Sequence, residues 1–303
     1  MGGSTLLECH GTSPSYHSRT ELPSEVLLSA RLGVSSWSLP TTDDSGWVSL
    51  VRHTGVGGLE LALDPLREGR SDWSAVRDGL ANLPITIVSA MTVIGSKDVL
   101  EDLGDGVLVP DEIWSETLKT AEANARLAFD LGLSLVTFRL MPRPVPEGSS
   151  ARESLVDRIR RVAAPFLGRG LAVALDVGRE STDETLGLVI DVGVPALGVT
   201  FDPAEVVIHG AGDPVEALDL LSAYVRQIRI RDATPPLSPG ARGAEVAVGD
   251  GAVDWGAFFE VMRSCRLSVP MVITRETGDT RVPDIKSAAA FVRAHGVEGI
   301  VAQ

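Results

Sequence analysis

Short apolar segments alternate with amphipathic helical patterns from about residue 30 to residue 295. Most of the apolar segments are continuous, which is typical of strands buried on both faces of a parallel sheet. Eight of them are predicted strands: Leu32–Ser38, Gly58–Leu63, Ile85–Ala90, Ser134–Leu140, Leu171–Val177, Leu197–Asp202, Val225–Asp232 and Pro270–Thr274. Strands that alternate with helices in this way indicate parallel βα units.

Start and stop signals mark the helices between these strands. Two capping boxes precede apolar stripes at helical spacing: Ser150 with Glu153, and Ser181 with Glu184. Asp213 and Pro214 are predicted to begin another helix, because an N-cap acceptor is followed by proline at the first helical position. Gly132 and Gly296 are predicted to end the helices that precede them, since glycine is favoured just after a helix.

The number and length of these units predict one large α/β domain. Eight βα units in about 270 residues favour a single (β/α)8 barrel, a TIM barrel, over residues 31–303. Residues 1–30 are rich in Ser, Thr, Gly and Pro and are predicted to form a poorly ordered N-terminal arm. A doubly wound open sheet is the alternative, but the Gly-rich phosphate turn typical of it does not follow the first predicted strand.

Composition narrows the classes of function. A net charge of −14 works against general nucleic-acid or anionic-membrane binding, so a small-molecule ligand is expected instead. Cys9 and Cys265 form no Cys-x-x-Cys pair, which gives no support to a structural zinc site. The N-terminus has no basic segment followed by an apolar one, and no apolar run of about 18 residues occurs, so a cytoplasmic protein is predicted.

Polar residues at the ends of the predicted strands are the candidates for chemistry, because barrels of this class place their active sites at the C-terminal ends of the strands. They are Glu60, Arg139, Asp176, Asp202, Arg229, Arg231, Thr274 and Glu276. Burial of an unpaired charge is costly, so their convergence indicates either a ligand site or an ion-pair network that plugs the barrel mouth. Side chains alternate along a strand, so Arg229 and Arg231 should share a face, as should Thr274 and Glu276.

Four segments of the second half resemble the xylose isomerase-like barrels known as sugar phosphate isomerases/epimerases. They are GVTFDPAEVVIHG (198–210), YVRQIRIRDA (224–233), EVAVGDGAVDW (245–255) and MVITRETGDTRVPDI (271–285). The resemblance covers roughly residues 30–295 and is most specific after residue 170, above all in the run G-D-G-x-V-D-W. It implies a role in carbohydrate metabolism and is compatible with a homodimer.

The resemblance also implies a divalent Mn, Mg or Co ion held by Glu, Asp, His and Glu on strands five to eight. In that family two glutamates move a proton through an enediolate on the metal-bound substrate. Here Asp176 stands in place of the first glutamate and Asp202 matches the aspartate, while Arg229 replaces the histidine and Thr274 the second glutamate. The metal site is therefore predicted to be degraded.

A guanidinium offers only hydrogen-bond donors and cannot be a metal ligand. Its charge at about 5 Å from a divalent ion would cost roughly 6–7 kcal/mol at an effective dielectric constant of 20. Asp176 and Asp202 remain as candidate metal ligands, and a bound ion would need help from Glu205 or Glu276. We therefore expect no cofactor more than we expect a metal.

Three functions stay open on these grounds. The first is an isomerase or epimerase that transfers a proton on a small polyhydroxylated or keto metabolite. The second is a metal-independent lyase, dehydratase or cyclase in which Arg229 and Arg139 bind an anionic metabolite and Asp176 or Glu276 is the base. The third is a non-catalytic relative that binds a ligand or partner. Residues predicted to line the substrate site are Glu60, Trp37, Arg231, Glu205, His209 and Thr274, with His209 placed in a loop after the sixth strand.

Overall fold

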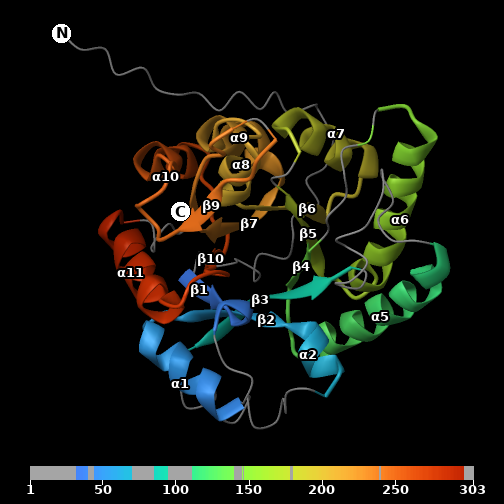
Figure 1. Cartoon of the computed structure of the whole chain (residues 1–303). Coiled ribbons are helices and arrows are strands. Elements are labelled where there is room, and N and C mark those ends of the chain that lie inside the picture. The colour runs from blue at the N-terminus through green and yellow to red at the C-terminus, as the bar shows by residue number, and fades with distance from the viewer. Residues whose placement is uncertain are drawn as a thin grey trace.

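Eight parallel strands close into a barrel in the computed structural model, with helices around the outside (Figure 1). The structure describes residues 32–39, 44–69, 85–94, 111–139, 145, 147–177, 180–238 and 240–296, without the side chains of residues 44–48. In barrel order the strands are β1 (Leu32–Ser35), β2 (Gly58–Ala62), β3 (Thr86–Val93), β4 (Leu135–Arg139), β5 (Ala172–Val177), β6 (Leu197–Phe201), β7 (Val225–Ile230) and β10 (Met271–Ile273). The predicted single-domain (β/α)8 barrel is confirmed, whereas the predicted arm of residues 1–30 lies outside the described residues.

The helices that follow the strands form the outer layer (Figure 1). They are α1 (Asp44–Thr54), α2 (Leu63–Arg67), α5 (Asp111–Asp130), α6 (Ser150–Leu167), α7 (Thr182–Val192), α8 (Pro203–His209), α9 (Pro214–Leu221), α10 (Trp255–Ser264) and α11 (Arg281–Ala294). Apolar side chains fill the space between helices and strands, as in the edge-to-face contact of Phe138 on β4 with Phe166 on α6 at 5.0 Å. Among the described helices, none combines the length and apolar character needed to cross a lipid bilayer.

Most of the predicted helix ends are correct. The Ser181–Glu184 capping box starts α7, Asp213 caps α9 with Pro214 in its first turn, and Gly132 follows α5 with a φ of 68°. The prediction for α6 is wrong by one residue. Its N-cap is Ser149, whose extended backbone lets the side chain accept a hydrogen bond from the amide of Arg152, while Ser150 is already helical.

The interior of the barrel is unusually polar in its middle layer. Glu60 on β2 is fully buried and accepts hydrogen bonds across the barrel from Thr137 on β4 and Gln227 on β7. Ser35 and Ser89 are in register with Glu60 on the two adjacent strands and are also fully buried. Branched apolar residues usually fill this position in such barrels. A carboxylate anchored here can support a charged group above it.

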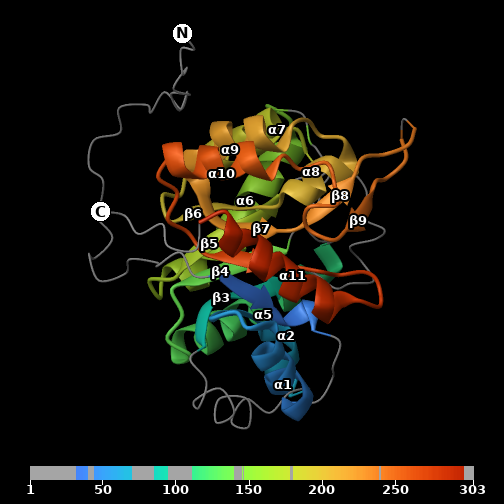
Figure 2. The same ribbon diagram turned by 90° about the vertical axis from the view of Figure 1, so that its left-hand side faces the viewer.

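Two strands end two or three residues earlier than predicted, β1 at Ser35 and β7 at Ile230, and both ends shape the mouth. After β1 the chain turns through a short 3-10 helix, η1 (Ser36–Ser38), where the Ser36 hydroxyl accepts from the amide of Ala62. After β7 the chain leaves the barrel at Arg231 and forms an antiparallel hairpin of β8 (Asp232–Thr234) and β9 (Ala244–Val246). Figure 2 shows this hairpin projecting beside α8, so residues distant in the sequence return to the mouth.

Candidate functional site

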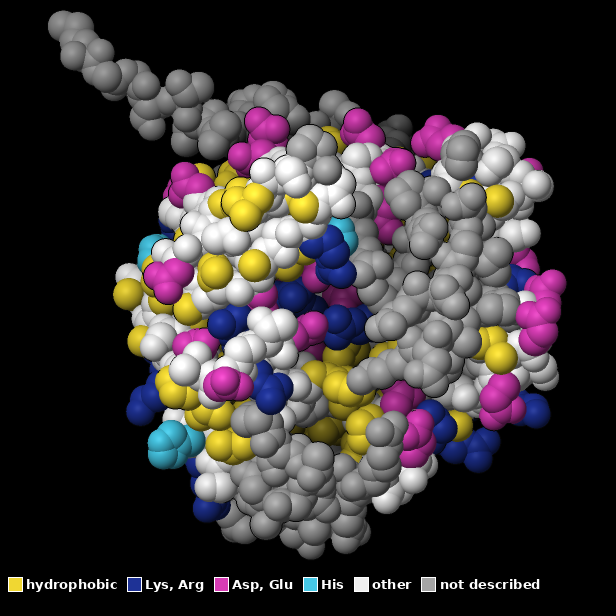
Figure 3. Space-filling model, in the orientation of Figure 1, with side chains coloured by type: hydrophobic (Ala, Val, Ile, Leu, Met, Phe, Trp, Pro, Cys, Tyr) yellow, Lys and Arg dark blue, Asp and Glu magenta, His cyan; other side chains and the backbone are white. Residues whose placement is uncertain are grey.

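A cavity of about 480 Å³ lies at the C-terminal ends of the strands, a volume suited to a small metabolite. Figure 3 shows basic and acidic side chains gathered in this hollow. Seven of the predicted site residues line it: Arg139, Asp176, Asp202, Glu205, Arg229, Arg231 and Glu276. The structure thus brings the strand-end charges together, and they form two connected clusters.

The inner cluster is centred on Arg229 and is almost closed to solvent. The guanidinium binds Asp176 with two parallel hydrogen bonds of 3.1 Å, from Nε and Nη2. Nη1 donates to Glu60 at 2.9 Å and to the hydroxyl of Thr274 at 3.3 Å, and Nη2 also donates to the sulfur of Met91 at 3.3 Å. An arginine has five N–H donors. All five are therefore used, and Arg229 cannot also donate to a ligand in this arrangement.

Glu60 and Asp176 share Arg229 but differ in their ionisation. Burial acts to raise the pKa of Glu60, yet the charge of Arg229 and its hydrogen bond hold that pKa below the usual range. Burial raises the pKa of Asp176 above its usual range in spite of the same guanidinium. The cavity is lined by Asp176 but not by Glu60, which lies beneath it as a support for Arg229.

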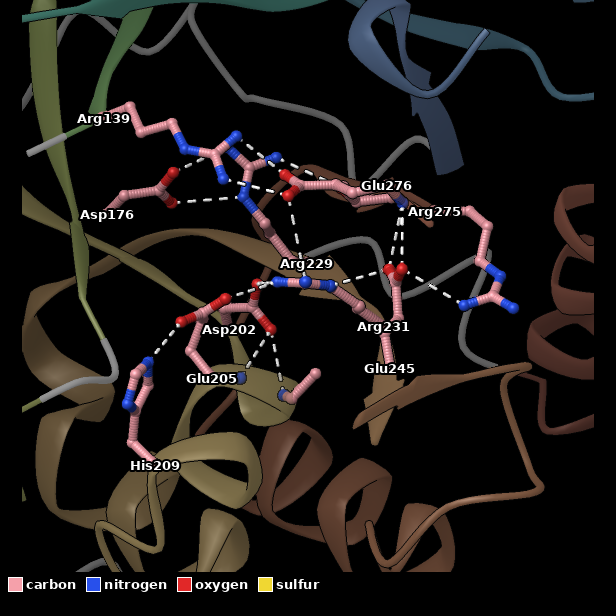
Figure 4. A network of polar contacts seen from close by, with 12 residues as sticks. Arg139, Asp176, Asp202, Glu205, His209, Arg229, Arg231, Glu245, Arg275 and Glu276 are labelled. Atoms are coloured by element: carbon pink, nitrogen blue, oxygen red, sulfur yellow. Dashed lines mark hydrogen bonds and ion pairs between the residues drawn. The ribbon is translucent and has the colours of Figure 1, made fainter. Parts of the chain in front are cut away.

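The outer cluster begins with Arg139 and Glu276, which face each other across the mouth (Figure 4). Nη1 and Nη2 of Arg139 donate to the two carboxylate oxygens of Glu276 at 2.7 and 3.0 Å. The Arg139 side chain is 32% exposed and that of Glu276 28%. Burial acts to raise the pKa of Glu276, but the hydrogen bonds and charge of Arg139 hold it below the usual range. Within the described residues, three N–H donors of Arg139 make no hydrogen bond.

Arg231 is the centre of the outer cluster and gathers four carboxylates (Figure 4). Nε donates to Glu245 at 2.8 Å, and Nη1 donates to Asp202 at 3.1 Å and Glu205 at 2.7 Å. Nη2 is 3.9 Å from Glu276, beyond hydrogen-bond distance. The two N–H donors of Nη2 therefore have no hydrogen-bond acceptor among the described residues, and a ligand oxygen could take that place.

Asp202 joins the outer cluster to the start of α8. One oxygen caps the helix by accepting from the amides of Ala204 and Glu205 at 2.9 and 3.3 Å, and the other accepts from Arg231. Burial raises the pKa of Asp202 to about 6, against the charge of Arg231. An aspartate with that pKa can exchange a proton near neutral pH.

Glu205 and His209 lie one turn apart on α8. His209 was predicted in a loop, which is wrong: it is the last residue of α8, and its Nε2 is 3.1 Å from Glu205. Burial acts to raise the pKa of Glu205, but His209 and Arg231 hold it below the usual range. If Nε2 of His209 donates to Glu205, it cannot also accept from Arg242, which approaches to 3.4 Å.

Thr274 and Trp37 lie at the edge of the predicted site. Thr274 is buried and accepts from Arg229, so its hydroxyl belongs to the inner cluster. Trp37 is half-buried in η1 and is not among the residues that line the cavity. Of the ten predicted catalytic and substrate residues, Glu60, Trp37, His209 and Thr274 therefore do not line the cavity in this arrangement.

Glu245 is a site residue that sequence reasoning missed. It lies on β9, is 2% exposed, and links Arg231 to Arg275 and to the loop that carries Glu276. Its position in the resembling segment 245–255 was the available signal. Only the return of the hairpin to the mouth brings its carboxylate to these partners.

The run G-D-G-x-V-D-W has a structural role here. The buried carboxylate of Asp232 accepts from the amides of Gly249, Gly251 and Val253 and from the indole of Trp255. A Cβ atom on Gly251 would lie 2.0 Å from that carboxylate, so glycine is required. The motif holds the loop after the hairpin in place and contributes no group that lines the cavity.

Asp176 and Asp202, which the sequence resemblance matches to metal ligands, are engaged by groups of the protein itself in this arrangement. Both oxygens of Asp176 face the guanidinium of Arg229, and both oxygens of Asp202 are engaged by Arg231 and the amides of α8. Across the described part of the chain, no three His, Cys, Asp or Glu side chains converge in a way that could hold a metal. A divalent ion at Asp176 would have to displace a buried guanidinium.

Comparisons with known proteins agree with this fold. Among curated proteins, no sequence match reaches significance. A xylose isomerase domain protein from Planctomyces limnophilus has a TM-score of 0.72 and 22% identity over 89% of this chain and 98% of its own. A probable 3-DHS dehydratase from Bacillus anthracis gives 0.65 and 17% over 87% and 98%. A D-allulose 3-epimerase from Methylomonas sp. gives 0.66 and 14% over 88% and 98%.

These structural likenesses are at low identity and show the fold alone. The family model is more specific, because it matches residues 48–295, which is most of the sequence and includes every strand of the barrel except β1. The chain belongs to the xylose isomerase-like TIM barrel family.

Proposed function

We propose that this protein is an acid–base enzyme that transfers a proton on a small polyhydroxylated or keto metabolite, with arginines in place of the divalent ion of its family. The observation that carries the proposal is the difference among the arginines in how many of their donors the protein itself uses. Arg229 uses all five donors inside the protein, while Arg139 and Arg231 line a 480 Å³ cavity rich in carboxylates and, within the described part of the chain, keep N–H donors without an acceptor.

The proposed reaction begins with removal of a proton from a carbon next to a carbonyl group. Negative charge then develops on the carbonyl oxygen, and unused N–H donors of Arg139 and Arg231 would stabilise it. Asp176 is the proposed base, since its side chain is 16% exposed and burial raises its pKa. Return of the proton to the neighbouring carbon or to the opposite face yields an isomer or epimer with all atoms conserved.

A dehydration would share the same first step and differ only in the second. After proton removal, a hydroxyl on the next carbon would leave with a proton as water. Asp202 is the proposed donor of that proton, because its pKa is raised to about 6 and it lines the same cavity. The family relatives include proteins named as an epimerase and a probable dehydratase, so both outcomes are tested together.

The proposal is tested by proton exchange with solvent. The protein is incubated in D2O with single ketoses and with hydroxy-keto acids, and the carbon-bound hydrogens are followed by NMR, with and without EDTA. We expect deuterium incorporation at a carbon next to the carbonyl for at least one compound, unaffected by EDTA. Asp176→Asn should abolish it, and Glu116→Gln, a change on the exposed face of α5, should leave it unchanged.

The opposite result identifies the non-catalytic alternative. If no compound exchanges, even with added Mn²⁺, Mg²⁺ or Co²⁺, the cavity is a binding site and the protein is not an acid–base enzyme of this kind. Exchange that requires one of these ions and survives Arg139→Ala would contradict the role of the arginines.

A further inference from the structure

The carboxylate of Glu245 accepts hydrogen bonds from four groups and forms an ion pair with Arg275. Arg231 Nε donates at 2.8 Å and Arg275 Nη1 lies at 3.1 Å. The amides of Glu276 and Thr277 donate at 3.0 and 2.7 Å, and the Thr277 hydroxyl donates at 2.6 Å. Burial acts to raise the pKa of Glu245, but these donors hold it below the usual range. The carboxylate is thus fixed as an anion between two loops.

These donors are of the kind that bind a phosphate group. Two guanidinium groups, two successive backbone amides and a hydroxyl converge on one point, which is a typical anion-binding arrangement. Their place in the fold agrees, because (β/α)8 barrels frequently bind phosphate between the loops after strands seven and eight. Here Glu245 belongs to the connection that follows β7, and Glu276 and Thr277 belong to the loop that follows β10.

Other backbone N–H groups near the mouth also donate to carboxylates of the chain. Asp232 accepts hydrogen bonds from the amides of Gly249, Gly251 and Val253, and Asp202 accepts them from the first amides of α8. The cavity is lined by four arginines and six carboxylates: Arg139, Arg229, Arg231 and Arg242, with Asp176, Glu180, Asp202, Glu205, Glu245 and Glu276. A lining with more acids than bases repels a dianion.

We infer that Glu245 occupies, from within the chain, the phosphate site of this barrel, and that the metabolite bound at the mouth carries no phosphate group. The chemistry of that metabolite rests on the proposed function. The occupation of the phosphate site by Glu245 does not, because it follows from the contacts of the carboxylate alone. The two can therefore fail separately.

The test removes the internal anion and offers inorganic phosphate. Melting temperatures of the wild type and of Glu245→Ala are measured over a phosphate titration at constant ionic strength. We expect no phosphate-dependent shift for the wild type and a rise of about 2 °C or more for Glu245→Ala, because bound ligand stabilises the folded state. Glu205→Ala is the matched control: it frees a donor of Arg231 but no backbone amide, and should show no rise.

Two results would overturn the inference. One is a phosphate-dependent rise in the wild type, which would show an open phosphate site. The other is a folded Glu245→Ala without a rise, which would show that the donors do not form one. Should Glu245→Ala fail to fold, the wild-type titration still decides, together with Glu245→Gln. That variant keeps the site filled, so a rise with phosphate would count against the inference.

Discussion

The inner and outer clusters of the mouth contain the same residue types but differ in solvent exposure and in how many N–H donors are occupied. Arg229 in the inner cluster is 4% exposed and has every donor occupied, whereas Arg139 in the outer cluster is 32% exposed and has three donors that meet no acceptor among the residues the structure describes. A buried and saturated charge can only hold its partners, while a partly exposed and unsaturated charge can bind something new. The difference separates an arginine that holds the site together from an arginine that can bind a ligand, within one continuous network of ion pairs.

The largest effect on stability is expected from breaking the inner cluster. Arg229→Ala leaves Glu60 and Asp176 buried without their partner, and such an uncompensated charge costs about 3–5 kcal/mol of unfolding free energy. Urea unfolding monitored by circular dichroism measures the loss. Arg263→Ala, which removes an exposed pair with Glu260, is the control and should cost at most about 1 kcal/mol. A similar loss in both variants would show that the buried inner cluster contributes no more to stability than an exposed ion pair.

A change in the outer cluster should affect function more than stability. Arg139→Ala removes a half-exposed pair, so the free energy of unfolding should fall by about 1 kcal/mol or less. Loss of a donor to a developing oxyanion typically lowers kcat about 10²–10³-fold. Steady-state kinetics on a compound that passes the D2O assay measures this effect. An unchanged kcat combined with a large loss of stability would reverse the assignment of the two clusters.

The pH dependence of the unfolding free energy should reveal the titration of Asp202. Its folded pKa of about 6 lies above the ordinary value of 3.8, so the folded state holds the proton more tightly than the unfolded state does. The stabilisation from this group is complete below about pH 4 and is lost as pH rises to about 6, a change of about 3 kcal/mol. Unfolding of wild type and Asp202→Asn across this range should diverge by that amount. Parallel curves would show that Asp202 does not titrate there.

The smallest expected effect is that of metal on the wild type. Arg229 occupies both carboxylate oxygens of Asp176. We therefore expect Mn²⁺, Mg²⁺ or Co²⁺ to shift the melting temperature by less than about 1 °C. The double variant Arg229→His with Thr274→Glu restores two ligand types of the family and should gain a metal-dependent rise. A clear rise in the wild type would mean that a divalent ion competes with the guanidinium.

Much of the fold and part of the site could be predicted from the sequence. Continuous apolar runs identified all eight barrel strands, because a strand buried on both faces must be apolar along its length. The same rule identified the charged residues at the strand ends as exceptions that must meet partners. Six of them line one cavity, since parallel strands place their C-terminal ends at the same side.

The roles of these charges depended on the tertiary structure. The sequence placed Arg229 and Arg139 together as ligand-binding candidates. Only the geometry showed that Arg229 uses all its donors, whereas Arg139 does not find acceptors for all of its donors among the described residues. Glu245 was not recognised, because it reaches the mouth through a hairpin whose pairing is not encoded by local periodicity. Helix α8 itself was not predicted, so His209 was assigned to a loop.

The sequence by itself determined the barrel, the side of the barrel that carries the chemistry and the set of charges gathered there. These follow from hydrophobic periodicity and strand direction, which are local properties of the chain. The tertiary structure decided which charge meets which, and hence which donors remain for a ligand. That outcome depends on distances between residues up to about 170 positions apart, such as Glu60 and Arg229, and hydrogen bonding is decided over tenths of an ångström.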